Sequence, residues 1–451
     1  MPFQFIKYTQ PAWYFNILPK AKGIIPTAIY HPQKLPLPNN LQLSADKVFE
    51  TLEAQYADIG FRAWHNGFLL QGNKNIVEEI DTTSKISLAD EYKFLNKYWG
   101  NKWALFALIV RLFSFKNPVK EIAAFNKSKK IKQTDLYNEL YDWSAYNHFQ
   151  SNLIQAQPFV TVIIPTLNRY EYLKDVLEDL EKQSYKNFEV TIVDQSENFN
   201  AKFYEGYNLK LNIIHQQAKE LWTARNRAVK ESKATYLLFY DDDSRIDEHW
   251  IEHHLKCIDF FECDISAGVS ISTIGGKVSK SYNHFRWADQ FDSGNAMVKR
   301  SVFEQIGLFD LQFNKQSMGD SEFGMRAYIN GFKSISNPYA KRLHLKANAG
   351  GLREIGHWDG FRPKKLFAPK PLPSVIYLYK KYHSKEYYRN AVYLGILLSN
   401  TSYKNKRSGK MLLKSVAITI IKLPLLAIQF RKSLNKANAM LKQGSKIEWL
   451  S

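Results

Sequence analysis

The chain has 451 residues and a mass of 52.5 kDa, and 45% of its residues are hydrophobic, 14% aromatic and 23% charged. This composition excludes a disordered chain, a collagen-like repeat and a coiled coil, because it supplies apolar area for at least one sizeable core. Its only cysteines, Cys257 and Cys263, are too few for a disulfide framework or a four-ligand zinc site. We therefore expect a reduced, intracellular setting.

The net charge of +19 is distributed unevenly along the chain. Residues 362–451 contain 19 Lys and Arg and two acidic residues, a net charge of +17, so the first 361 residues carry +2. A basic, partly amphipathic helical C-terminal region on a nearly neutral body points to a polyanion, either acidic lipid or nucleic acid. Residues 377–382 and 412–422 mix basic with apolar side chains, which favours an anionic membrane surface. A solvated tail packed on the rest of the chain is the alternative.

Neither a secretory signal nor a spanning helix is expected. The first 20 residues are aromatic and lack a basic head followed by an uninterrupted apolar run. The longest apolar stretch, residues 411–430, contains Lys414, Lys422 and Pro424. These residues argue against crossing a bilayer, though not against lying in its interface.

The pattern along the chain changes at Pro158. Residues 1–157 open with a proline-bearing aromatic segment and continue with mixed helical patterns, such as residues 102–115, so we expect an N-terminal accessory region of unknown role. Beyond it, short β-branched runs alternate with amphipathic helical patterns. Strands are predicted at residues 159–165, 188–194, 211–215 and 236–240, and helices at residues 171–183 and 224–232. This alternation predicts a sheet of parallel strands covered by helices on both faces.

Polar residues follow three of these strands, at residues 165–169, 194–196 and 241–243. Ligands of open α/β sheets bind beyond the carboxyl ends of the strands, so these segments are expected to share one crevice. Side chains at i and i+2 of an extended segment share a side, which lets Asp241 and Asp243 face one ligand while Asp242 points away. Such oxygen ligands suit Mg²⁺ or Mn²⁺. The alternative is a solvated acidic loop.

Residues 159–345 resemble glycosyltransferase family 2 with the GT-A fold, because five segments occur in the family's order. The segments are Val-Ile-Ile-Pro-Thr-Leu-Asn-Arg (162–169), Thr-Ala-Arg-Asn-Arg (223–227), the three aspartates at the Asp-x-Asp motif (241–243), an acceptor-side segment (293–310) and Gly-Asp-Ser-Glu-Phe-Gly-Met-Arg (319–326). The resemblance implies a GT-A catalytic domain over residues 158–361, with a Rossmann-like mixed sheet flanked by helices.

The resemblance also implies the roles of individual residues. The nucleotide-sugar site would comprise Pro165, Thr166, Asn168, Arg169, Asp194, Arg225, Asn226, Asp241 and Asp242. Asp241, Asp243 and His344 would bind the metal, although a lone histidine is commonly structural. Asp320 would be the general base, or alternatively the N-cap of a helix over residues 321–330. Gly319 departs from the glutamate that many relatives carry.

The implied activity is inverting transfer of a sugar, most often from a UDP-sugar with Mn²⁺ or Mg²⁺, to a saccharide or lipid-linked saccharide. The setting would be surface polysaccharide assembly on the cytoplasmic face of a membrane. A carboxylate has to accept the proton of the attacking hydroxyl, and a cation stabilises the leaving diphosphate. A non-catalytic binding or scaffold subunit of the same fold is the alternative, which Gly319 favours. Residues 350–353 form either a loop closing over the diphosphate or a plain turn, and Trp222 and Trp287 either pack or stack on a ligand.

Overall fold

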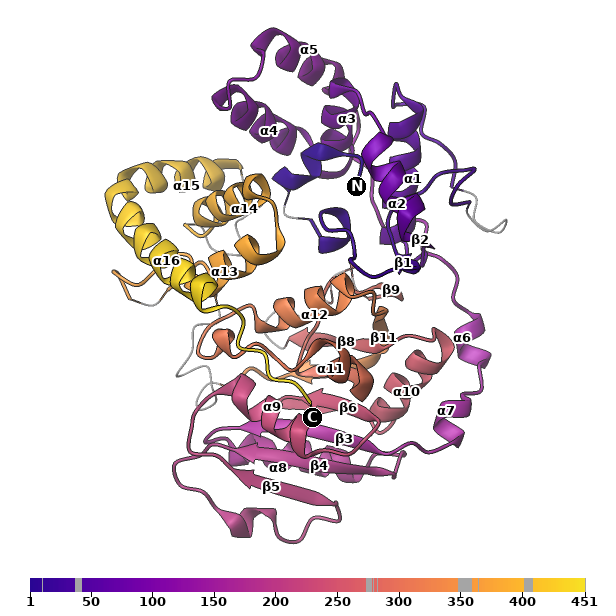
Figure 1. Cartoon of the computed structure of the whole chain (residues 1–451), viewed down its shortest axis with the longest axis vertical. Coiled ribbons are helices and arrows are strands. Elements are labelled where there is room, and N and C mark those ends of the chain that lie inside the picture. The colour runs from indigo at the N-terminus through magenta and orange to yellow at the C-terminus, as the bar shows by residue number, and fades with distance from the viewer. Residues whose placement is uncertain are drawn as a thin grey trace. The chain divides into compact units, whose positions relative to one another are not determined.

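The structure, a computed structural model, describes residues 1–9, 11–36, 43–272, 278, 280–281, 283–347, 359–363, 365–400 and 409–450. The chain forms two compact units (Figure 1). Unit 1 consists of Met1–Ser144, His284–Asp289 and Tyr328–Gly331, and unit 2 consists of Ala145–Asn283, Gln290–Ala327 and Phe332–Ser451.

Unit 1 is mainly helical. Its elements are η1 (Gln4–Tyr8), η2 (Trp13–Phe15), β1 (Ile24–Pro26), α1 (Leu52–His65), β2 (Gln71–Asn73), α2 (Lys74–Thr83), α3 (Leu88–Trp99), α4 (Asn101–Phe113), α5 (Pro118–Ser128) and β9 (Arg286–Trp287). Gly100 separates α3 from α4, and its φ of 82° lies in the left-handed region that glycine enters without steric cost. Tyr92 and Leu95 of α3 pack with Leu108 of α4 and Phe125 of α5 in one apolar cluster.

Unit 2 is built on a mixed sheet. Its strands are β3 (Val160–Thr166), β4 (Phe188–Asp194), β5 (Leu211–His215), β6 (Tyr236–Tyr240), β7 (Ser244–Ile246), β8 (Ile265–Ser272), β10 (Asn295–Lys299) and β11 (Ser334–His344). They run in the order β5-β4-β3-β6-β10-β8-β11-β7. The predicted strands β3 to β6 are confirmed and are parallel to one another, while β10 is antiparallel to β6 and β8. The α/β class and the mixed sheet flanked by helices are as the resemblance implies.

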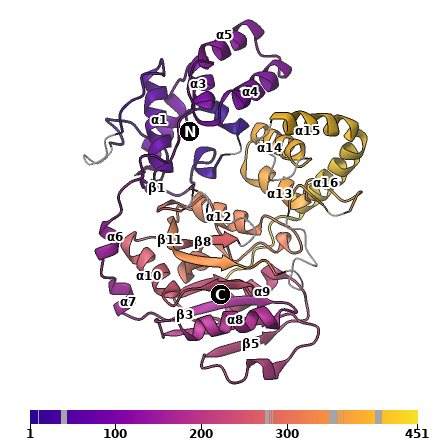
Figure 2. The ribbon, with the colours of Figure 1, turned by 180° about the vertical axis from the view of Figure 1, so that it is seen from behind.

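Helices cover both faces of this sheet. They are α6 (Ala145–His148), α7 (Asn152–Gln155), α8 (Tyr170–Glu181), η3 (Ala201–Tyr204), α9 (Leu221–Glu231), α10 (Trp250–Phe260), α11 (Arg300–Ile306), η4 (Leu311–Phe313) and α12 (Gly319–Ile329). Helix α9 lies on the face seen in Figure 1, and α8 lies on the face seen in Figure 2. In the register of β3 with β4, Thr166 is opposite Asp194, so both strands end at the same edge of the sheet. This edge carries the polar segments singled out in the sequence.

The C-terminal region packs on unit 2 through α13 (Pro373–Tyr382), α14 (Lys385–Leu398), α15 (Gly409–Ile421) and α16 (Leu423–Gln443). Asp310, buried at the end of the acceptor-side segment, anchors it. Its carboxylate accepts hydrogen bonds from the Tyr377 hydroxyl at 2.9 Å, the Lys446 amide at 2.9 Å and the Lys381 ammonium at 3.3 Å. A substantial part of the C-terminal region is therefore a structural element of this unit, as the alternative interpretation of the tail supposed.

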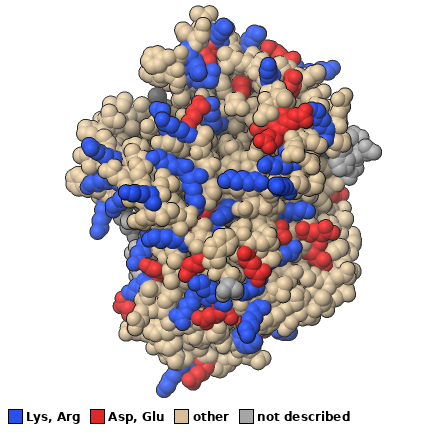
Figure 3. All heavy atoms as spheres, in the orientation of Figure 1, with Lys and Arg blue, Asp and Glu red and all other residues tan. Residues whose placement is uncertain are grey.

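The C-terminal region also presents basic and apolar groups to solvent. Lys and Arg side chains gather over α15 and α16 (Figure 3). Around the junction of these helices, Ile420, Ile421 and Leu423 are 66%, 78% and 60% exposed. Among the residues described, no helix has both the length and the apolar character that crossing a bilayer requires.

Replacing Asp310 by alanine is expected to lower the free energy of unfolding by about 3 kcal/mol, because it removes a buried acceptor that Tyr377, Lys381 and the Lys446 amide share. Urea unfolding of the full chain measures this change. Glu304→Ala is the control, since that side chain is 50% exposed in its pair with Arg300 and should contribute less than about 1 kcal/mol. Equal effects of the two substitutions would contradict the anchoring role of Asp310.

Candidate active site

A cavity of about 280 Å³ lies beyond the carboxyl ends of β3 and β6. It is lined by Pro165, Leu167, Arg169, Leu221, Arg225, Asp241, Asp242, Asp243, Ser270, Asp292, Ser293, Asp320, Arg342 and His344. Five carboxyl groups thus face three guanidinium groups. With all of them ionised the lining has a net charge of −2, a balance that suits a divalent cation.

The three consecutive aspartates do not continue the extended strand. Strand β6 ends at Tyr240, residues 242–243 form a turn and β7 begins at Ser244. The prediction that Asp242 points away was therefore wrong, because it assumed an extended backbone. The Asp242 carboxylate lines the cavity and accepts hydrogen bonds from the Thr166 hydroxyl at 2.8 Å and the Arg169 guanidinium at 2.9 Å. Burial raises the pKa of Asp242 to about 6 despite the neighbouring arginine.

Asp241 is held between two arginines. Arg225 donates to one carboxylate oxygen at 3.0 Å, and Arg342 donates to the other at 2.7 Å. Burial alone would raise the pKa of Asp241, but these two cations outweigh it and hold the pKa well below its ordinary value. Arg342 also pairs with Asp292 at 2.9 Å. A Cβ atom on Gly294 would lie 2.2 Å from an Asp241 oxygen, so this cluster closes only around a glycine.

Neither Arg342 nor Asp292 was given a role in the sequence analysis. Arg342 lies two residues before His344 on β11, so its guanidinium is directed to the same cavity. Alternation along a strand is a signal that could have found Arg342. Asp292 is preceded by a segment without regular structure, and its position follows from the fold alone.

A group of three side chains is arranged to hold a cation. Ligand atoms of Asp241, Asp243 and His344 all lie within 4.8 Å of one another. His344 Nε2 is 3.3 Å from Asp243 Oδ1, and this contact lowers the pKa of Asp243 against the opposing effect of burial. Each carboxylate oxygen has two lone pairs, so an oxygen that accepts one hydrogen bond still has a lone pair for a metal. Two carboxylates and an imidazole are a suitable donor set for Mn²⁺ or Mg²⁺.

Asp320 lies in the same cavity, on a different element. Helix α12 begins at Gly319, so Asp320 stands in its first turn and not at the N-cap position of the alternative interpretation. The carboxylate accepts hydrogen bonds from the Ser293 amide at 3.0 Å and from the Ser293 hydroxyl. Burial raises the pKa of Asp320 to about 6, although Arg225 opposes that shift. A carboxylate with such a pKa is suited to exchange protons near neutral pH.

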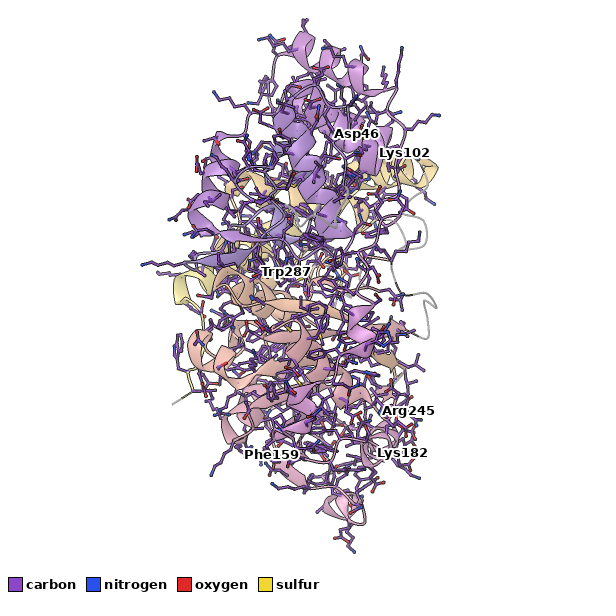
Figure 4. The ribbon with its side chains drawn as sticks, turned by 90° about the vertical axis from the view of Figure 1, so that its right-hand side faces the viewer. Asp46, Lys102, Phe159, Lys182, Arg245 and Trp287 are labelled. Carbon is purple, nitrogen blue, oxygen red and sulfur yellow. The ribbon has the colours of Figure 1, made fainter. Side chains whose placement is uncertain are left out.

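The departure at Gly319 has a steric cause. A Cβ atom there would lie 2.2 Å from the indole of Trp222, which is 3% exposed and packs on Phe309 at 5.0 Å between ring centroids. The indole therefore occupies the space into which a side chain at position 319 would project. Trp287 packs elsewhere, buried in unit 1, where its Nε1 donates to the Leu70 carbonyl at 3.0 Å (Figure 4). Both tryptophans are packing residues.

Several predicted ligand residues are not among the residues that line this cavity. Asn226 is buried, and both ends of its amide bond the backbone of Phe309 at 2.9 Å, so it orders the segment before α12. Thr166 reaches the site only through its hydrogen bond to Asp242. Asn168 is exposed in the loop after β3, with a positive φ of 54°.

Asp194 is buried beneath two tyrosines. Its carboxylate accepts hydrogen bonds from the Tyr170 hydroxyl at 2.6 Å, the Tyr204 hydroxyl at 2.7 Å and the Ser196 amide at 2.8 Å. These three hydrogen bonds tie the loops around Asp194 together. The predicted loop at residues 350–353 lies outside the described residues.

Residues 161–324 match the family model described as Glycosyl transferase family 2. The chain is 27% identical over 176 residues to Glycosyltransferase AglE of Haloferax volcanii, covering 36% of this chain and 55% of that relative. It is 24% identical over 214 residues to Putative glycosyltransferase EpsH of Bacillus subtilis, covering 42% of this chain and 62% of the relative. The chain thus spans about half the length of these curated relatives.

Two solved structures are similar to part of the chain. One is S. aureus TarS 1–349 in complex with UDP-GlcNAc, with 18% identity, a TM-score of 0.44 and coverage of 62% of this chain and 81% of that one. The other is mannosyltransferase PcManGT from Pyrobaculum calidifontis in complex with GDP-Man and Mn²⁺, with 14% identity, a TM-score of 0.40 and coverage of 66% and 91%.

Placing glutamate at position 319 is expected to destabilise the protein by about 2 kcal/mol, because the new side chain has to displace the Trp222 indole. Trp222→Ala alone is also destabilising, since it leaves a cavity. The double variant should cost about 1–2 kcal/mol less than the sum of the single changes. Urea unfolding of the four proteins measures this coupling, and strict additivity would refute the steric explanation of Gly319.

Proposed function

We propose that residues 161–324, which match the family model described as Glycosyl transferase family 2, form a glycosyltransferase of that family, and that this chain transfers a sugar from a nucleotide-sugar donor to a hydroxyl group of a saccharide or a lipid-linked saccharide. The observation that carries this proposal is the position of Asp320. A carboxylate whose pKa is raised to about 6 faces the cavity that contains the Asp241, Asp243 and His344 group. One cavity therefore contains a base and a candidate cation site, which are the two groups that the proposed displacement at a sugar carbon uses.

In this proposal Asp320 is the general base. A sugar hydroxyl is a poor nucleophile until its proton is removed as it attacks the anomeric carbon. The raised pKa makes Asp320 a stronger base than an ordinary aspartate, and it is still ionised at neutral pH. The hydrogen bonds from Ser293 orient the carboxylate toward the cavity. The bond between the acceptor oxygen and the anomeric carbon forms as the bond between that carbon and the diphosphate oxygen breaks. The nucleoside diphosphate leaves, and the proton of the acceptor hydroxyl passes to Asp320.

We propose that Asp241, Asp243 and His344 bind a divalent cation. When bound, such an ion would supply positive charge that stabilises the leaving diphosphate. The net charge of −2 on the lining supports the proposed cation, because a diphosphate that entered without one would meet more carboxylates than arginines. Arg169, which pairs with Asp242 at 2.9 Å and with Asp243 at 3.2 Å, adds a fixed positive charge at the loop after β3.

Inversion of the anomeric carbon is the proposed stereochemical outcome. A retaining double displacement requires an available carboxylate nucleophile. Asp292 also lies in the cavity, but Arg342 binds both of its oxygens, and the Ser270 hydroxyl donates to it at 2.6 Å. The cation at Arg342 helps to lower the pKa of Asp292 against burial. Asp320 is thus the one acid of the described lining without an arginine bonded to it, which supports a single displacement.

We further propose that residues 158–361 are the catalytic domain, residues 1–157 an accessory region and residues 362–451 a basic C-terminal region that lies on the cytoplasmic face of a membrane. The exposed Ile420, Ile421 and Leu423, with lysines at positions 414 and 422, support contact with an anionic surface. We propose a UDP-sugar as the donor and surface polysaccharide assembly as the setting.

Asp320→Asn is expected to reduce transfer by about 10²- to 10⁴-fold and to leave nucleotide affinity unchanged, because the amide cannot accept the proton. In the wild type, kcat/KM should rise with pH through about 6 and level off above it, since the base acts in its ionised form. Ser321→Ala, in the same helical turn, is the control and should retain turnover. Full turnover by Asp320→Asn would exclude this residue as the base.

Titration calorimetry tests the cation site. UDP should bind more tightly with Mn²⁺ than without it, and Asp243→Ala should abolish this difference because it removes a ligand and its charge. The control is Asp247→Ala, just beyond β7, whose side chain is 49% exposed. If UDP, GDP and dTDP all fail to bind to the wild type with Mn²⁺, the assignment as a nucleotide-sugar enzyme is wrong.

A further inference from the structure

The turn between α4 and α5 in unit 1 exposes bulky apolar side chains. Phe113 is 82% exposed, Phe115 is 97% exposed and Val119 is 75% exposed. We call these three residues the α4–α5 tip. On α4, Leu105 and Ile109 continue the apolar surface at 45% and 44% exposure. Large apolar groups gathered on one part of a surface mark an interaction site, unlike single exposed ones.

Helix α4 is apolar on two sides for different reasons. One side buries Ala104, Ala107 and Leu108 against α3, and this side accounts for its packing. The other side carries Leu105, Ile109 and Phe113 at a spacing of four residues, which aligns them in one stripe that the unit leaves exposed. A helix that is apolar on its exposed side as well is typical of a surface that meets an apolar phase.

The backbone at the tip favours a smaller residue than the one it carries. Phe115 has a φ of 57°, the left-handed region in which glycine is favoured and a bulky residue is strained. Its amide bonds the Leu112 carbonyl at 3.0 Å, and the Lys116 amide bonds the Arg111 carbonyl at 3.1 Å, which ends α4. Glycine would close this turn without strain, yet the position carries a phenylalanine that is 97% exposed.

The surroundings of the tip are strongly basic. Between residues 101 and 132 the chain has eight Lys and Arg and one acidic residue, a net charge of +7. All seven lysines are exposed: Lys102, Lys116, Lys120, Lys127, Lys129, Lys130 and Lys132. The single acid, Glu121, is buried and bonded by the Arg111 guanidinium at 2.6 Å and by the Tyr92 hydroxyl at 2.7 Å. Lys127 pairs with Glu50 at 3.5 Å, and the other six lysines make the field that this segment presents to solvent positive.

The buried contacts of Glu121 also fix helices α4 and α5 relative to each other. The ion pair of Arg111 with Glu121 joins the end of α4 to the start of α5, and the Arg111 guanidinium lies 4.5 Å from the ring centroid of Phe5. Further along α5, the Asn96 amide donates to the Ser128 hydroxyl at 2.6 Å. Figures 1 and 2 both show α3, α4 and α5 side by side. The tip is thus a rigid projection, and ordering it on a surface costs little entropy.

We propose that the α4–α5 tip inserts into the interface of an anionic membrane, with the surrounding lysines on the lipid headgroups. Aromatic and aliphatic groups enter the interfacial region of a bilayer, and basic residues bind its negative surface. An acidic protein partner would need a matching apolar pocket for the phenylalanines besides its acidic groups, whereas an anionic bilayer interface offers both to any projecting tip. This surface lies in a different unit from the C-terminal helices and does not depend on the transferase chemistry.

Co-flotation of the full chain with vesicles tests the proposal. The wild type should bind vesicles of phosphatidylcholine and phosphatidylglycerol and should bind phosphatidylcholine alone weakly. The double variant Phe113→Ser with Phe115→Ser should lower the partition coefficient by about tenfold or more, because its apolar groups are lost. Leu52→Ser is the matched control, since that side chain is 60% exposed in the same unit but lies on α1. It should bind as the wild type does.

Charge reversal tests the second half of the interaction. Lys116→Glu with Lys120→Glu should lower the partition coefficient by about fivefold or more for each lysine, and the effect should shrink with added salt. Lys22→Glu with Lys85→Glu, exposed positions of unit 1 outside α3 to α5, is the control with the same change of net charge. Equal loss with both pairs would show a non-specific effect of net charge and overturn the proposal.

Insertion itself has a spectroscopic readout. Both native cysteines are buried, so Phe115→Cys offers one exposed thiol for an environment-sensitive fluorophore. Its emission should shift to the blue with anionic vesicles, and a label at Leu52→Cys should not respond. An unshifted label on bound protein, or a tip variant that changes only the oligomeric state, would refute membrane insertion. Unchanged UDP binding in the tip variants separates this outcome from a failure of the transferase assignment.

Discussion

The neutralisation of Asp241 by Arg225 and Arg342 is the interaction on which the rest of the site depends. Three consecutive aspartates at the end of a buried strand repel one another, and arginines offset their charges. Arg169 pairs with Asp242 and Asp243, while Arg225 of α9 and Arg342 of β11 pair with Asp241. The two arginines thereby tie a helix, a strand and the turn after β6 into one cluster. Gly294 lets that cluster close, since any side chain there would overlap it.

Much of this architecture could be predicted from the sequence, and the failures have physical causes. The β-branched runs at β3 and β4 predicted their strands because burial on both faces demands such residues. The placement of Asp242 failed because alternation holds only while the backbone stays extended, and residues 242–243 turn. The resemblance gave Asn226 a place in the nucleotide site, whereas in the structure its amide bonds the backbone of Phe309 at both ends and also donates to Glu448 at 3.3 Å. A motif gives residue types at a spacing and does not show which neighbour takes their hydrogen bonds.

The net charge of a long segment can hide a strongly charged part of it. The first 361 residues carry +2 in total, which describes a nearly neutral body, yet residues 101–132 alone carry +7. Acidic residues elsewhere in the chain offset the +7 in the total. They do not neutralise it locally when they lie farther from it than the Debye length, about 8 Å at physiological salt. The exposed state of Phe113 and Phe115 is likewise invisible in the sequence, where the α4 pattern is that of an ordinary buried helix.

The aspartates that line the cavity have different neighbours, and these neighbours give them different roles. Asp241 and Asp292 touch guanidinium groups and stay ionised, so they contribute fixed negative charge. Asp320 is bonded only by Ser293 among the contacts described, and burial raises its pKa, so it can exchange a proton. Gly319 also affects the surroundings of Asp320. The Trp222 indole fills the place where a glutamate at position 319 would add another carboxyl group beside Asp320. The indole places an apolar group there, so burial is the largest influence on the pKa of Asp320, with Arg225 opposing the upward shift and Asp292 adding to it.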